Sequence, residues 1–337
     1  MGRLAGLAGA VVLAAAGAAH AADKAEIADW WRGYEVAPTA KTPDGRRLRY
    51  YCQGKGGPVV ILESGLGSGA WTWRTIQRDM ARSTRVCSYD RAGYGGSDEA
   101  KDARDIEALA ADLAVVAKAA GGGRPVILMG HSLGGPIVRQ FAYHHPKLVA
   151  GVVLLDPSGD GQVERFAAVI PKFKDGQEAA YAPVKACQAA AEKGPMAEGS
   201  RDYVLCVGPP PADMPADLAH YHVAYNQSPV HDRAILAELQ NALSPASTHE
   251  AAAARRPLGD IPFIVLTAGK DQANPGFTPE DTRNATAVWR QMHWEMTSLS
   301  TQGRRRFVDG SGHYIHLDRP QAVLDALADV LAEVRGR

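Results

Sequence analysis

Apolar runs that are typical of buried strands alternate with helical segments along much of the chain. The clearest runs are PVVILE (58–63), PVILMG (125–130), GVVLLD (151–156) and PFIVLTAG (262–269). They are nearly continuous rather than alternating, which is typical of strands with both faces covered. Between them, apolar residues recur at helical spacing, as at Ile106, Leu109, Leu113 and Val116. The alternation predicts an α/β architecture, with a mostly parallel sheet between layers of helices.

One long stretch, residues 159–258, interrupts this alternation. It has helical and loop character, it is rich in alanine and proline, and it is far longer than an ordinary connection. Its apolar content and two cysteines favour a folded insertion over a disordered segment. We therefore predict a core formed by residues 22–158 and 259–337, with a helical cap or lid at 159–258.

The first residues resemble an export signal. Arg3 precedes a stretch of small apolar residues, and Ala19 and Ala21 fit a signal-peptidase site, so residues 1–21 are predicted to be a signal peptide. A retained anchor is the alternative, but the apolar run is shorter than the about 20 residues that a span requires. We therefore predict an exported protein, periplasmic or extracellular, with no stable membrane span.

The four cysteines, Cys52, Cys87, Cys187 and Cys206, bear on this prediction. An even number in an oxidising compartment suggests two disulfides, although four cysteines permit three pairings. Cys52 and Cys87 lie in two strand-like runs, whereas Cys187 and Cys206 share a helical region. We therefore expect disulfides Cys52–Cys87 and Cys187–Cys206, against the alternative of four buried thiols.

Composition narrows the classes of partner. The chain has 37 basic and 37 acidic residues, which leaves no basic face for nucleic acid. The cysteines have no histidine-rich neighbourhood with metal-ligand spacing. We predict no nucleic-acid partner, no metal and no organic cofactor.

A single serine sits where a strand-like run turns into a helix, in VILMGHSLGGPIVRQF (126–141). Ser132 has Gly130 two residues before it and Gly134 two residues after it. A serine hydroxyl becomes a strong nucleophile only when a base removes its proton. A sharp strand-to-helix turn presents the hydroxyl to such a base, and the crowded turn requires glycine on both sides, as in the Gly-x-Ser-x-Gly nucleophile elbow.

The base and the acid should follow the serine in the chain. His313 follows a strand in a loop with Gly310 and Gly312, and it is our candidate base. Asp271 follows the strand at 262–269 and is the preferred acid. Asp156, at the end of the strand at 151–156, is the alternative acid.

Two backbone N–H groups are candidates to stabilise an oxyanion. One belongs to Leu133, which directly follows the serine. The other belongs to Leu66, which lies between Gly65 and Gly67 in the loop after the run at 58–63.

Taken together, the motifs resemble those of the α/β-hydrolase superfamily. The matching pieces occur in family order and cover most of residues 48–156 and 259–335; they are LESGLGSGAW, RVCSYDRAGYGGSD, GHSLGGPIVRQFAYHHP, VVLLDPSG, LTAGKD and GSGHYIHLDRP. The resemblance implies a mostly parallel, eight-stranded sheet flanked by helices, with a helical cap inserted after the strand that carries Asp156. It also implies a triad of Ser132, Asp271 and His313.

The resemblance has further implications. It places the early antiparallel strand beside the run TRVCSYD, which brings Cys52 near Cys87. Ser64 stands where many relatives carry histidine. A serine rather than an aspartate nucleophile argues against the dehalogenase and epoxide-hydrolase branches.

These features predict an exported serine hydrolase that cleaves a small carboxylic ester, or an amide, through an acyl-enzyme. Two alternatives use the same triad: a peptidase that removes N-terminal residues, and an acyltransferase that excludes water. A non-catalytic binding module on a hydrolase scaffold is a remote third alternative.

Overall fold

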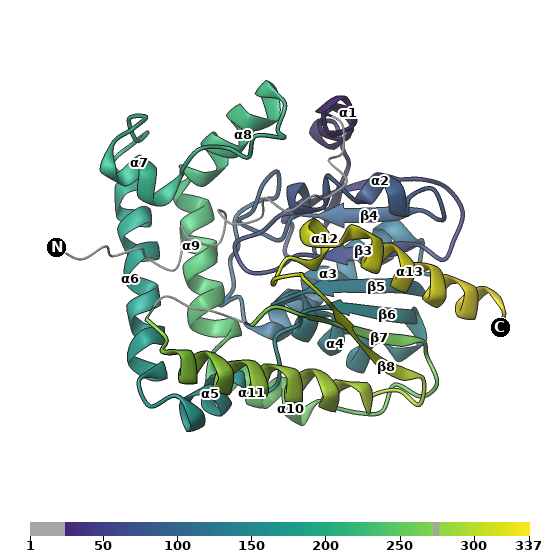
Figure 1. Ribbon diagram of the computed structural model, residues 1–337. Helices are drawn as coiled ribbons and strands as arrows, with labels where there is room; N and C mark the ends of the chain where they lie inside the picture. The colour runs from purple at the N-terminus through teal and green to yellow at the C-terminus, as the bar shows by residue number, and fades with distance from the viewer. Residues whose placement is uncertain (1–23, 272–275) are drawn as a thin grey trace.

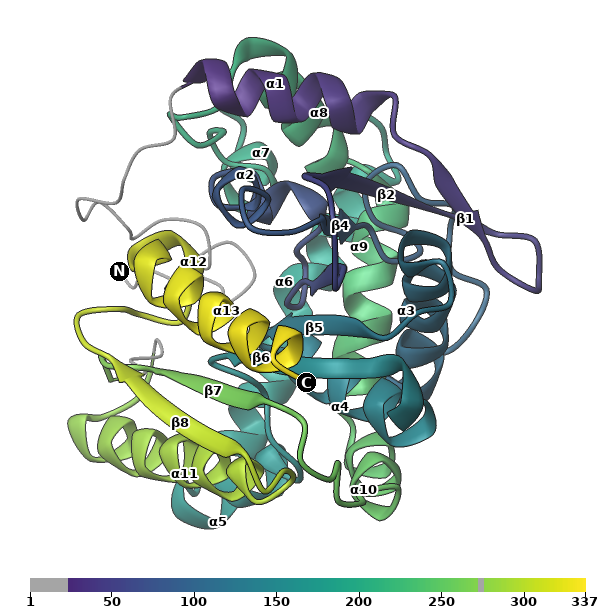
Figure 2. The same cartoon turned by 90° about the vertical axis from the view of Figure 1, so that its right-hand side faces the viewer.

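The computed structural model describes residues 24–271 and 276–337, with backbone only for residues 174–180. The predicted signal peptide, residues 1–21, therefore lies outside the described residues. Figures 1 and 2 show a central sheet with helices on both faces. In Figure 1, helices α6 to α9 stand to one side of that sheet.

Eight strands form one sheet in the order β1-β2-β4-β3-β5-β6-β7-β8. The pairs β1–β2 and β2–β4 are antiparallel, and all the other neighbours are parallel. The mostly parallel, eight-stranded sheet predicted from the sequence is thus confirmed. The strands are β1 (Thr39–Lys41), β2 (Arg47–Gln53), β3 (Val60–Glu63), β4 (Val86–Tyr89), β5 (Val126–His131), β6 (Val149–Leu155), β7 (Phe263–Ala268) and β8 (Gly303–Val308).

The helices fall into those of the core and those between β6 and β7. The core helices are α1 (Lys24–Glu35), η2 (Ala70–Trp73), α2 (Gln77–Met80), α3 (Ile106–Gly121), α4 (Gly134–His144), η3 (Pro146–Leu148), α11 (Pro279–Thr297), α12 (Ile315–Asp318) and α13 (Pro320–Arg335). The stretch between β6 and β7, called the cap below, contains α5 (Gln162–Val169), α6 (Phe173–Ala191), α7 (Arg201–Cys206), α8 (Ala216–Asn226), α9 (Pro229–Ala237), η4 (Glu238–Ala242) and α10 (Pro245–Ala253). No strand occurs among the described residues of the cap.

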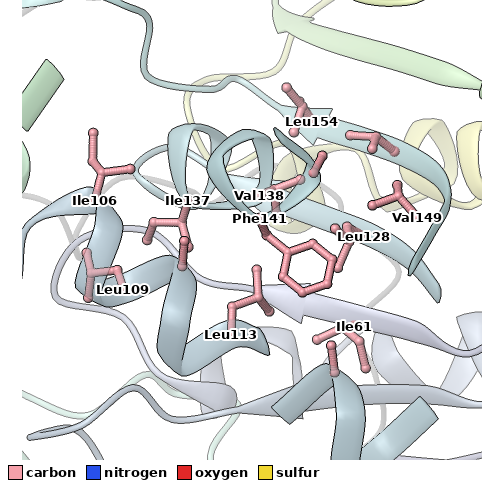
Figure 3. Close-up of a cluster of buried hydrophobic side chains, with 14 of the residues drawn as sticks. Ile61, Ile106, Leu109, Leu113, Leu128, Ile137, Val138, Phe141, Val149 and Leu154 are labelled. Carbon is pink, nitrogen blue, oxygen red and sulfur yellow. The ribbon is translucent and has the colours of Figure 1, made fainter. Parts of the chain in front are cut away.

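The continuous apolar runs are explained by burial on both faces of the sheet. Because successive side chains of a strand point to opposite faces, Leu128 packs towards α3 and α4, whereas its neighbour Met129 packs towards α2 and α13. Figure 3 shows the first of these two layers, in which Phe141 of α4 lies between α3 and the strands. A strand with one solvated face would instead alternate apolar and polar residues.

Two disulfides join the cysteines in the pairs expected from the sequence. Cys52 of β2 and Cys87 of β4 are directly opposite each other in an antiparallel pair of strands. Cys187 of α6 and Cys206 of α7 connect two cap helices. None of the described residues is a free cysteine.

The close packing around Phe141 makes a stability prediction. Phe141 is 1% exposed, so Phe141→Ala leaves a cavity in the layer between α4 and the sheet. We expect the free energy of unfolding to fall by about 3–5 kcal/mol, measured by urea denaturation. Val204→Ala, at a position that is 66% exposed, is the control and should change it by less than about 0.5 kcal/mol. Equal effects of the two substitutions would contradict the assignment of Phe141 to the core.

Candidate active site

Ser132 lies in a tight turn between β5 and α4, with a left-handed backbone (φ 53°) that non-glycine residues seldom adopt. A Cβ on Gly130 would lie 2.5 Å from the carbonyl oxygen of Gly134, and a Cβ on Gly134 would lie 2.5 Å from that of Glu63. Both positions therefore exclude any larger residue. The strained turn and the crowding are the features expected of a nucleophile elbow.

His313 and Asp156 are joined by a hydrogen bond. His313 lies in the loop after β8, and its Nδ1 donates to Asp156 Oδ2 over 2.8 Å. Asp156 directly follows β6, is fully buried and also has a left-handed backbone (φ 42°). Its other oxygen, Oδ1, accepts a hydrogen bond from the N–H of Ala268 at the end of β7 (2.9 Å). The side chain of His313 remains 27% exposed, so its ring is held by a buried anion but accessible from one side.

Asp271, the acid preferred from the sequence, does not contact His313. Its side chain is 54% exposed, and Oδ1 pairs with Arg290 of α11 at 3.2 Å. The physical reason is position: Asp271 lies three residues beyond the end of β7, where the chain has left the sheet, whereas Asp156 is the first residue after β6. The preference for Asp271 over Asp156 is corrected accordingly, and the structure brings Asp156 to the histidine.

The surroundings of Asp156 keep its carboxylate ionised. Burial raises the pKa of Asp156, but the hydrogen bond and charge of His313, with smaller contributions from His293 and the Ala268 N–H, outweigh burial and leave it below its usual value. Donors to the charged form have this effect on any buried carboxylate. An ionised acid at this position holds Nδ1 of His313 protonated and leaves Nε2 free to accept a proton.

His293 of α11 was not identified from the sequence. Its Nδ1 accepts from the Thr267 hydroxyl (2.9 Å), and its Nε2 donates to the carbonyl of Pro157 (2.9 Å). Nδ1 lies 3.9 Å from Asp156 Oδ1. Burial lowers the pKa of His293 to about 4, so the ring is neutral and supports the segment that carries Asp156. The only sequence signal was a histidine at helical spacing from Trp289 and Met296, a pattern typical of a core residue.

Two further histidines pack behind His313. His131 donates from Nε2 to the carbonyl of His313 (2.9 Å), and its ring lies 4.9 Å from that of His316. Burial, followed by the nearby histidines, lowers the pKa of His131, and burial lowers that of His316 to about 3. Both rings are therefore neutral near pH 7, and His313 is the partly exposed member of the cluster.

The loop after β3 lies against the elbow. A Cβ on Gly65 would be 3.1 Å from Ser132 Cβ, which shows how closely the two backbones approach. Ser64 fixes this loop: its hydroxyl donates to the carbonyl of Gly69 (3.1 Å) and accepts from Trp73 Nε1 (2.9 Å). Leu66 follows in this loop, and Leu133 begins the turn into α4.

The site thus has a strained serine, a histidine–carboxylate pair and a glycine loop at one edge of the sheet. Parallel strands end at this edge, so the loops that follow β3, β5, β6 and β8 meet there. Among residues 24–271 and 276–337, no group of three or more metal-ligating side chains is arranged around a common point. Across the same residues, every helix is too short or too polar to span a bilayer.

These features define an α/β protein with a candidate serine–histidine–aspartate site. A family model described as the alpha/beta hydrolase fold matches residues 58–198. The sheet topology and this match show that the chain has the α/β-hydrolase fold.

Known proteins are similar at low identity. YqjL of Bacillus subtilis is 24% identical over 279 residues, which cover 82% of this chain and 85% of that protein. A mutant of a Pseudomonas aeruginosa protein provisionally assigned as an epoxide hydrolase has a TM-score of 0.65 and 22% identity, covering 89% of this chain and 96% of that one. A thermophilic esterase from Thermogutta terrifontis has a TM-score of 0.56 and 20% identity, covering 88% and 97%. At these identities the structural matches establish the fold.

The low pKa of His293 predicts a change in pH-dependent stability. Unfolding returns its pKa to about 6.5, so the unfolded chain gains a proton as the pH falls from 6.5 towards 4, and stability is lost across that interval. His293→Gln removes this contribution. Between pH 7 and pH 5, we therefore expect the free energy of unfolding to fall by about 2 kcal/mol less in the variant than in the wild type. Urea denaturation at both pH values measures the difference.

His220→Gln is the control for this prediction, because His220 lies on the exposed side of α8. It should leave the pH dependence of the wild type unchanged. Parallel stability curves for the wild type and His293→Gln would contradict a buried, neutral His293.

Proposed function

We propose that this chain is an exported serine hydrolase that cleaves a carboxylic ester, or an amide, through an acyl-enzyme on Ser132. The observation that carries the proposal is the 2.8 Å hydrogen bond from His313 to the buried carboxylate of Asp156, at the sheet edge that holds the elbow. Histidine, carboxylate and elbow are the parts that serine acyl transfer requires. The two disulfides support export, because such bonds persist in oxidising compartments.

In the proposed mechanism, His313 Nε2 takes the proton of the Ser132 hydroxyl as the oxygen attacks the substrate carbonyl. Asp156 keeps Nδ1 protonated and stabilises the imidazolium that forms. The N–H groups of Leu66 and Leu133 stabilise the negative oxygen of the tetrahedral intermediate, and the N-terminus of α4 adds a favourable dipole. The imidazolium then protonates the leaving alcohol or amine. A water molecule, activated by His313, releases the acid and restores Ser132.

The identity of the nucleophile favours acyl transfer over epoxide opening. A carboxylate that opens an epoxide forms an ester, which water can hydrolyse to release the product. A serine oxygen would form an ether instead, and the same site could not hydrolyse it. An ester or amide substrate gives a serine an intermediate that water can cleave, so the esterase-like chemistry fits Ser132 better than the epoxide chemistry.

The role of Ser132 is tested by removing its hydroxyl. We expect Ser132→Ala to lower kcat for p-nitrophenyl acetate by at least about 10⁴-fold and to abolish labelling by a fluorophosphonate probe. Ser158→Ala is the control, since the Ser158 N–H bonds to the carbonyl of Ser132 but its hydroxyl has no proposed role, and its labelling should persist. Continued labelling of Ser132→Ala would refute Ser132 as the nucleophile.

The choice of acid is tested with two matched substitutions. Asp156→Asn removes the charge that holds the His313 tautomer, so we expect kcat to fall by about 10³- to 10⁴-fold. Asp271→Asn, at an exposed residue that pairs with Arg290, should change kcat by less than about threefold. Steady-state kinetics on the same ester compare them. The reverse order of effects would return the catalytic role to Asp271.

A further inference from the structure

Arg91 is fully buried directly behind the glycine loop, and all of its donors are used. An arginine side chain has five N–H donors. Nη1 donates to Glu63 Oε1 and to the carbonyl of Ser64, both at 2.7 Å. Nη2 donates to the carbonyl of Gly65 (2.9 Å) and to Glu238 Oε2 (2.8 Å), and Nε donates to Glu238 Oε1 (2.9 Å). Two of the five bonds therefore hold the backbone of the loop, and two hold Glu238.

Glu238 reaches this position from the cap. It is the first residue of η4, it is 0% exposed, and it lies 147 residues after Arg91. Its carboxylate also accepts from Arg104 Nη2 (2.9 Å) and from the hydroxyl of Tyr94 (2.8 Å). Burial raises the pKa of Glu238, but the charges of Arg91 and Arg104 outweigh burial and keep it ionised. The cap therefore places a fixed anion behind the loop.

The bond to Gly65 also sets the direction of the Leu66 N–H. The carbonyl of Gly65 and the N–H of Leu66 belong to one planar trans peptide unit, so they point in opposite directions. Arg91 and the N–H of Ser68 (3.2 Å) both hold that carbonyl oxygen. Rotation of the peptide, which would turn the Leu66 N–H away, therefore requires breaking both bonds. The Leu66 N–H donates to no acceptor among the described residues.

We propose that Glu238 is a positioning residue for the oxyanion site: it fixes Arg91, and through Arg91 the Gly65–Leu66 peptide that presents the Leu66 N–H. Through this residue, the cap helps to orient a donor that stabilises the oxyanion in the chemical step. This inference rests on the proposed acyl-transfer function. Lysine at position 91 lacks the planar five-donor group that binds the two carbonyls and the two carboxylates together. A neutral residue at position 238 would lose the charge-assisted pair of bonds that fixes Arg91.

The test compares an ester with its thionoester, in which sulfur replaces the carbonyl oxygen. Sulfur is a weak acceptor of hydrogen bonds, so thionoester cleavage depends less on the oxyanion donors. Glu238→Gln should lower kcat for the ester by about 10- to 100-fold with KM nearly unchanged. It should lower thionoester cleavage far less, so the ester-to-thionoester rate ratio should fall about tenfold. Tyr94→Phe, which removes only the hydroxyl bound to Glu238, should lower the ratio by about fivefold or less.

Glu295→Gln is the matched control. Glu295 of α11 forms the same kind of two-bond pair with a cap arginine, Arg165 (2.6 and 2.8 Å), but contacts no part of the glycine loop. It should leave the ratio unchanged. Fluorophosphonate titration of Ser132 normalises each rate to the folded fraction. If Glu238→Gln lowers both rates equally, so that the ester-to-thionoester ratio is unchanged, the positioning role of Glu238 is overturned.

A crystal structure of Glu238→Gln separates the two proposals. The expected result is a Gly65–Leu66 peptide that is rotated or present in two orientations. The wild-type orientation at full occupancy would refute the positioning role, whatever the activity. If the wild type cleaves neither substrate, the proposed function fails, and this structural readout still decides whether Glu238 fixes the loop.

Discussion

The candidate site depends on the burial and hydrogen bonding of one carboxylate, that of Asp156 at the end of β6. A buried charge is costly unless it is paired and hydrogen-bonded, so Asp156 requires donors on all sides. The Ala268 N–H at the end of β7 and the His313 ring after β8 supply them, and His293 lies beside them. Three consecutive strands are thereby joined through one side chain. The sheet therefore orients the imidazole of His313 by fixing the position of its partner, Asp156.

Much of the core was predictable from local patterns. Continuous apolar runs indicated strands that are buried on both faces, and the glycines around Ser132 indicated a turn too crowded for any Cβ. The pairing of Cys52 with Cys87 also followed from neighbouring strand-like runs. The strands and the turn are each encoded within a few residues, and the disulfide prediction needed only that both cysteines lie in strand-like runs, although they are 35 residues apart.

The contacts that sequence reasoning misplaced or missed are those made across long separations. Asp156 and Asp271 both follow strands, and only the direction in which the chain leaves the sheet distinguishes them. Glu238 lies in a helical stretch with no recognisable motif, yet its partner is 147 residues away. The N-terminal helix α1 is a similar case, because Tyr34 contacts both Asp90 of the core and Tyr221 of the cap. No periodicity encodes such partners.

The cap is therefore less independent than its place in the chain suggests. It leaves the sheet after β6 and returns at β7, and the Asp156–Ala268 hydrogen bond closes its base. An insertion with adjacent ends can change without disturbing the sheet. Its inner end, however, supplies one member of a buried cluster with three cations and three anions: Arg46, Arg91, Arg104, Glu63, Asp112 and Glu238. Loss of one anion would leave three buried arginines with two carboxylates, so the cluster would carry an uncompensated positive charge, which is strongly destabilising. A cap of different sequence could thus alter substrate choice, but it must still place an acidic group behind the loop that follows β3.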